Sequence, residues 1–178
     1  MPDLLPTLRD LLTNQYEAAL SALHLSIARC PDELWDEPVA RWKFCTAAFH
    51  AVFFADVYLQ PSDDEEALKQ QAFHGESAAA FRDYEELQDR EPEFYYARDF
   101  VVSYLRFVRE KAQSTLAAES AETMPGPSGF QRRKCTRAEL HVYNIRHIQH
   151  HAAQLALRLR QNDGAVSIPW VGHEWKEA

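Results

Sequence analysis

The chain has little cysteine, and this shortage excludes two classes of small protein. Its 178 residues include three cysteines, Cys30, Cys45 and Cys135, with no Cys-x-x-Cys pair. A disulfide framework and a cysteine-built zinc knuckle are therefore not expected, and the thiols should be reduced. Cys45 precedes His50 by five residues, about 140° around a helix, so we expect Cys45 to be a small buried apolar side chain.

Positive charge and long apolar runs are also scarce. The 19 basic residues against 27 acidic ones leave a net charge of −8, which argues against nucleic acid or an anionic membrane as a partner. The Arg132-Arg-Lys134 group is accordingly interpreted as a surface patch. No run approaches the length of a membrane span, and Met1–Pro6 lacks the basic flank and apolar run of a signal peptide. We therefore expect a cytoplasmic protein.

Glycine is rare, with five in the chain, and no segment alternates apolar and polar residues as a half-buried strand does. The abundant Ala, Leu, Glu, Gln and Arg favour helix. Apolar residues at helical spacing predict four long helices and one short helix. The predicted helices are Thr7–Arg29, Trp42–Leu59, Ser77–Leu87 (the short one), Pro92–Ala118 and Thr136–Gln161.

The last of these helices has the clearest start. Thr136-Arg-Ala-Glu139 is a capping box, in which two side chains satisfy backbone N–H groups at the helix N-terminus. The breaker Met124–Gly129 before it is too short to separate two domains. We therefore predict one all-α domain over residues 1–178, an antiparallel four-helix bundle with a short extra helix and long connections.

Three histidines are the main candidates for chemistry. His147 and His151 lie four residues apart, so both imidazoles leave one face of the last helix, one turn apart. His50 lies in an apolar stretch of the second long helix. Two nitrogens at this spacing and a third from a neighbouring helix form the three-ligand set of catalytic zinc, with one position open. The alternative is that these are core or surface histidines.

The other histidines have weaker prospects as ligands. His150 lies about 100° from His151 around the helix, toward the outside. His141 precedes His151 by two to three turns, too far to share its ion, and we expect a core histidine there. His24, His74 and His173 have no partner at useful spacing and are expected to be structural or solvated.

These histidines carry a resemblance to the DinB-like superfamily (DinB/YfiT-like metal-dependent enzymes). Its members have one histidine on the second helix and an H-x-x-x-H pair on the last, often within H-x-x-H-H-R-G-Q. His50, His147 and His151 match the three ligand positions, and Gln154 matches the final glutamine. Ala152 and Ala153 stand where Arg and Gly are common, which leaves the ligands intact and removes the arginine. Pro31–Trp35 and Pro169–Gly172 extend the resemblance over nearly the whole chain.

The resemblance implies a metal-dependent hydrolase or a transferase of a low-molecular-weight thiol, acting on a small molecule. Three neutral imidazoles leave a divalent ion its full charge, which lowers the pKa of bound water or holds a thiolate. Of the metals that accept such a site, zinc and nickel are expected here. Glu139 and Glu17 are candidate general bases by sequence only, so the catalytic residues stay unassigned.

Two non-enzymatic functions remain open: a metal- or small-ligand-binding module of a stress response, and a structural bundle with vestigial histidines. We also predict a homodimer. The resemblance implies dimers, and Phe49, Phe53 and Phe107 fall away from the inferred core faces, where apolar side chains often mark an interface.

Overall fold

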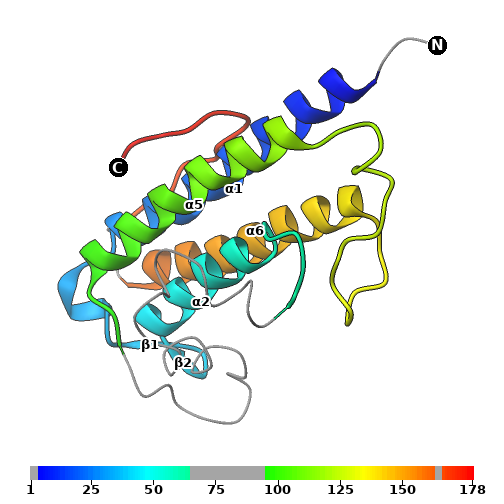
Figure 1. Cartoon of the computed structure of the whole chain (residues 1–178). Helices are drawn as coiled ribbons and strands as arrows, with labels where there is room; N and C mark the ends of the chain where they lie inside the picture. The colour runs from blue at the N-terminus through cyan, green and yellow to red at the C-terminus, as the bar shows by residue number, and fades with distance from the viewer. Residues whose placement is uncertain (1–3, 65–94, 163–165) are drawn as a thin grey trace.

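Four α-helices make up most of the computed structural model, which describes residues 4–64, 95–162 and 166–178. They are α1 (Leu5–Ala28), α2 (Phe44–Val57), α5 (Arg98–Ala118) and α6 (Arg137–Gln161) (Figure 1). A 3-10 turn, η1 (Asp32–Leu34), and a hairpin of two short strands, β1 (Pro38–Val39) and β2 (Trp42–Lys43), connect α1 to α2. The all-α prediction is therefore confirmed for the described residues, none of whose helices is long and apolar enough to cross a membrane.

Two of the predicted helix starts are wrong. Trp42 belongs to β2, not to the helix, because it pairs with Val39 in the antiparallel hairpin. The predicted start at Pro92 lies outside the described residues, but α5 begins only at Arg98, after extended backbone at Ala97. The predicted short helix Ser77–Leu87 also lies outside the described residues.

The start of α6 is as predicted. The Thr136 hydroxyl accepts a hydrogen bond from the Glu139 N–H at 3.2 Å, and the Glu139 carboxylate accepts one from the Thr136 N–H at 2.8 Å. The capping box is thus complete, and it fixes where the histidine-bearing helix begins.

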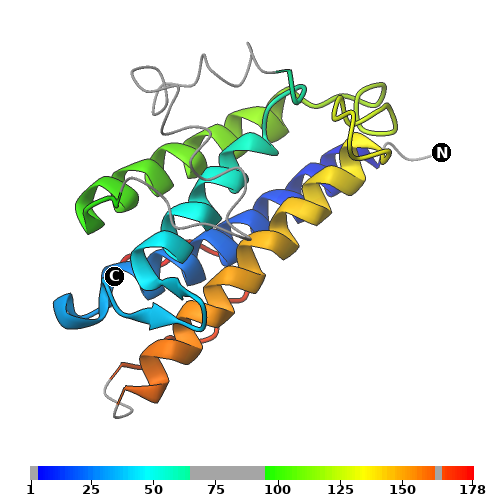
Figure 2. The same cartoon turned by 90° about the horizontal axis from the view of Figure 1, so that it is seen from below.

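Each helix packs against two others around one apolar core: α1 and α2 both contact α5 and α6. The predicted antiparallel arrangement is wrong for two of these pairs. Tyr16 meets His141 and Ser26 meets Ala152, so α1 and α6 run in the same direction, as Figure 2 shows. The pair α2 and α5 is likewise parallel, because Phe49 lies beside Phe100 and Asp56 lies beside Lys111.

Helix α2 is buried on nearly every side, and this corrects the predicted positions of two aromatic residues. Phe49 and Phe53 are each 1% exposed, although the helical wheel placed them away from the core. Phe49 stacks on Tyr96 with ring centroids 4.1 Å apart, because the chain before α5 covers this face of α2. Within α2, only His50 and Phe54 are not fully buried.

Candidate metal centre

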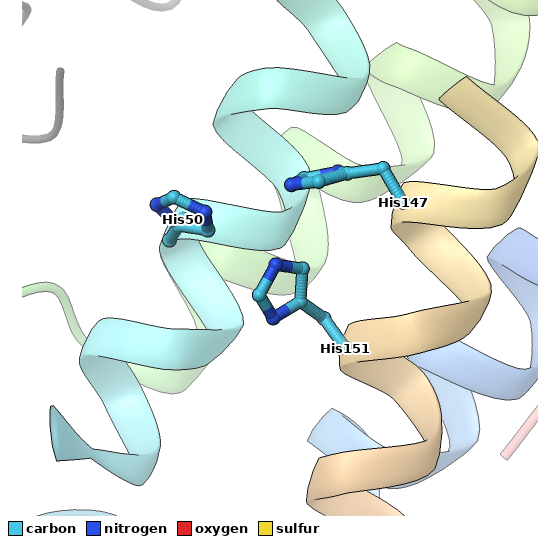
Figure 3. Close-up of side chains that lie close together, drawn as sticks. All are labelled: His50, His147 and His151. Carbon is cyan, nitrogen blue, oxygen red and sulfur yellow. The ribbon is translucent and has the colours of Figure 1, made fainter. Parts of the chain in front are cut away.

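The structure brings His50, His147 and His151 together between α2 and α6 (Figure 3). One ring nitrogen from each residue can be chosen so that all three lie within 4.8 Å of one another. The ring centroids are 4.6 Å apart for His147 and His151, 4.8 Å for His50 and His151, and 5.5 Å for His50 and His147. Residues nearly a hundred positions apart in sequence thus form one cluster.

Hydrogen bonds between α2 and α6 set the register that aligns these histidines. Asn144, buried one turn before His147, donates its side-chain N–H to the Ala55 carbonyl at 2.9 Å. At the start of α6 the Arg137 guanidinium donates to the carbonyls of Leu59 and Gln60 at 3.0 and 2.7 Å. The Ala55 carbonyl lies in the last turn of α2, where helix geometry leaves carbonyls without partners, and the other two carbonyls follow the end of the helix.

The cluster lies in an aromatic shell. The Phe54 ring is 4.7 Å from that of His50, the Trp42 ring is 5.6 Å from His50, and the Tyr58 ring is 5.8 Å from His147. Phe54 and Tyr58 belong to the apolar stretch around His50, whereas Trp42, which was assigned to a helix, comes from the hairpin. Apolar rings exclude water and restrict the imidazole rotamers, which favours a preorganised ligand set.

Burial keeps the three imidazoles neutral. Loss of hydration, reinforced by the neighbouring histidines, lowers the pKa of His147 to about 2 and that of His50 to about 3. Burial lowers the pKa of His151 to about 4. Since only the neutral ring has a free lone pair, all three side chains are ready to coordinate a metal at neutral pH.

The hydrogen bonding of the cluster fits a divalent ion. Among the described residues, Nδ1 of His50 and Nδ1 of His147 are buried and have no hydrogen-bond partner. His151 Nδ1 lies 2.9 Å from Gln154 Oε1. If Nδ1 carries the proton of this bond, Nε2 is left to bind the ion, and such an outer partner is usual for a metal-bound histidine.

The nitrogens can lie somewhat farther apart than they would around a bound ion. A zinc-like ion about 2.0–2.1 Å from three nitrogens in tetrahedral geometry holds them about 3.4 Å apart. Starting from the upper limit of 4.8 Å, each nitrogen would have to move toward the ion by about 0.8 Å. The three histidines could hold one metal ion.

The other histidines lie outside this cluster. His150 is exposed, with its ring 5.2 Å from that of His151, on the outer side as predicted. His141 is a fully buried core residue, 3.2 Å from the Tyr16 hydroxyl and 3.1 Å from Glu119. His24 is buried against Trp175 and His173 is exposed, while His74 lies outside the described residues.

The two acidic residues considered as general bases have other roles. Glu17 accepts hydrogen bonds from Arg109 and Gln113 of α5 at 2.8 and 2.6 Å. Glu139 is part of the capping box at the N-terminus of α6, away from the ligands. Neither belongs to the histidine cluster. Cys45 is buried as predicted, and burial raises the pKa of its thiol to about 11.

Comparison with protein-family models, with curated proteins and with solved structures finds no match to this chain. The functional argument therefore depends on the chain's own residues and geometry.

Proposed function

We propose that the protein is a metal-dependent enzyme of DinB-like architecture that activates a small nucleophile at a centre formed by His50, His147 and His151. One observation carries the proposal: three neutral imidazoles from two helices converge within 4.8 Å inside an aromatic shell. When bound, zinc or nickel would supply a Lewis acid that lowers the pKa of a coordinated nucleophile.

A low-molecular-weight thiol is the favoured nucleophile. Among the described residues, the only hydrogen bond to the cluster comes from Gln154, an amide that does not act as a base at neutral pH. A thiol has a pKa about 7 units below that of water, so it needs less help to ionise. In the proposed reaction the thiol proton passes to solvent, sulfur bonds to an electrophilic carbon, and the leaving group departs with its electron pair.

The chain's own residues hold and orient the centre. Gln154 fixes the ring of His151, and Asn144 ties α6 to α2 one turn from His147. Trp42, Phe54 and Tyr58 limit the access of water.

A non-catalytic module that binds metal or a small ligand is the second candidate. It is favoured by Ala152 and Ala153, which stand where the resembled family commonly has Arg and Gly. Ala152 is 1% exposed and packs against α1, where its carbonyl lies 3.5 Å from the Ser26 hydroxyl. This position therefore contributes packing in this chain, and no charge.

Metal content and thiol transfer together test the proposal. Protein made without a histidine tag should contain about one divalent ion per chain by elemental analysis. The conjugation of glutathione to chlorodinitrobenzene is measured by absorbance. The reaction should require the protein and should stop when a chelator is added. Bound metal without turnover of this pair or of a nitrophenyl ester would favour the non-catalytic module. Protein that takes up no metal would contradict the enzyme and a metal-binding module, and would leave only a module that binds a small ligand.

A further inference from the structure

A pocket of about 790 Å³ lies between the β1–β2 hairpin and the C-terminal half of α6. Its volume falls within the range of small-molecule sites. His151 lines it, and so does Trp42, whose ring lies 5.6 Å from that of His50. A molecule held in this pocket would therefore lie beside the histidine cluster.

The charge of the pocket is opposite to that of the protein. Arg41 and Arg158 line it, together with neutral and apolar side chains and His150, and none of the described residues that line it has a carboxylate. The chain as a whole has a net charge of −8. A region with two guanidinium groups and no acidic residue is thus a local exception, and it attracts anions.

The hairpin holds both arginines at this place. Arg41 lies in the two-residue turn between β1 and β2, beside Ala40, whose φ of 56° is in the left-handed region. Arg158 donates from Nε to the Pro38 carbonyl at 2.9 Å. That bond uses one N–H and leaves the two terminal amino groups of the guanidinium for a ligand. Among the described residues neither arginine has an ion-pair partner.

We propose that this pocket binds small organic anions, with a carboxylate on Arg41 and Arg158 and an apolar part against Trp42 and Leu157. The guanidinium fork matches the two oxygens of a carboxylate. If the proposed function holds, the nucleophile or its electrophilic partner is a carboxylic acid, and this part rests on the proposed function. The binding of organic anions itself does not require a metal.

A matched pair of probes tests the proposal in metal-free protein, which removes direct coordination of the acid to an ion. Phenylbutyrate and its neutral amide have the same shape, and their affinities are measured by calorimetry. The acid should bind about tenfold more tightly or better. Arg41→Leu and Arg158→Leu should each reduce that preference several-fold, while Arg160→Leu, an exposed change outside the pocket lining, should leave it intact.

Equal affinity for acid and amide, or no measurable binding of the acid, would overturn the proposal. So would an equal effect of Arg160→Leu, because the preference would then reflect general charge. Arg41→Leu removes no hydrogen bond within the described residues, so it should fold normally. It therefore still tests the proposal if Arg158→Leu misfolds. Protein that contains no metal but still prefers the acid would reject the proposed enzyme and keep the anion site.

Discussion

His150 and His151 are neighbours in sequence with different surroundings. His151 is 8% exposed and belongs to the cluster, whereas His150 is exposed on the outer side of α6. We predict that His151→Ala lowers metal occupancy strongly and that His150→Ala leaves it nearly unchanged. The helical circular dichroism of both variants should match the wild type, because the core is intact. Elemental analysis measures the occupancy, and equal losses would mean that the wrong member of the pair was chosen.

Gln154 provides the outer hydrogen bond of the cluster. Its side-chain oxygen orients the His151 ring, and loss of such a partner typically lowers metal affinity about 10–100-fold. We expect Gln154→Ala to have this effect in competition with a chromogenic chelator. Gln149→Ala, an exposed change on the same helix, is the control. An unchanged affinity for Gln154→Ala would show that the ring is held by packing alone.

At the scale of the element, the N-terminus of α6 is stabilised by its own sequence. Thr136→Ala removes the hydroxyl that accepts from the Glu139 N–H and should lower the free energy of unfolding by about 0.5–2 kcal/mol. Thr136→Ser keeps the acceptor and should lose little. Urea unfolding followed by circular dichroism compares the two variants. Equal losses would indicate that the threonine methyl group matters more than the cap.

The helices also show where periodicity misleads. An amphipathic wheel assumes one buried face, but α2 is covered by α5, α6, the hairpin and the residues before α5. Phe49 and Phe53 were therefore misplaced. On α5, which has a clear polar side, periodicity works better: Val101, Tyr104 and Val108 lie at helical spacing and are buried, although Phe100 is 37% exposed.

At the scale of the whole molecule, buried histidines make stability depend on pH. His24 of α1 is 1% exposed and stacks on Trp175 near the C-terminus, with centroids 4.8 Å apart. Burial lowers its pKa, and the opposing effect of Glu177, 3.6 Å away, is smaller; Arg106 adds to the lowering. Below about pH 6.5 the unfolded chain therefore binds a proton at this histidine that the folded protein does not bind.

We predict that the free energy of unfolding falls as the pH drops from 7.5 to 5.5, by at most about 1.4 kcal/mol per pH unit for each such histidine. His24→Phe should keep the stacking on Trp175. It should reduce the dependence of the unfolding free energy on pH by the contribution of one histidine. Neither buried ring nitrogen of His24 has a hydrogen-bond partner among the described residues, so this variant should not be less stable at pH 7.5. Urea titrations of chelator-treated protein measure the slope. A slope unchanged in His24→Phe would contradict this origin.

The homodimer stays a prediction, and the structure removes part of the support that came from the sequence. Phe49 and Phe53 are buried within one chain and cannot form the interface, and Phe107 is half-buried. The resemblance to dimeric proteins is what remains. Sedimentation at micromolar concentration should give about twice the chain mass of 20.5 kDa. A species at the single-chain mass would refute the dimer.

The sequence alone determined what depends on neighbours along the chain. The helical class, the extents of α1 and α6, and the capping box follow from propensity and periodicity within a few turns. The outward position of His150 and the common face of His147 and His151 follow from the 100° advance per residue. His50 could be proposed as their partner only through the resemblance and the apolar stretch around it.

The tertiary structure decided what depends on contacts between distant segments. The parallel pairing of α1 with α6 brings His141 to Tyr16, and the register of α2 against α6 brings His50 to His151. Trp42 and Arg41 reach the site because two residues on each side of a tight turn form a hairpin. Strands of two residues are too short to show an alternation of apolar and polar side chains in the sequence. Local rules fix which way a side chain leaves its helix, but packing between helices fixes what it meets.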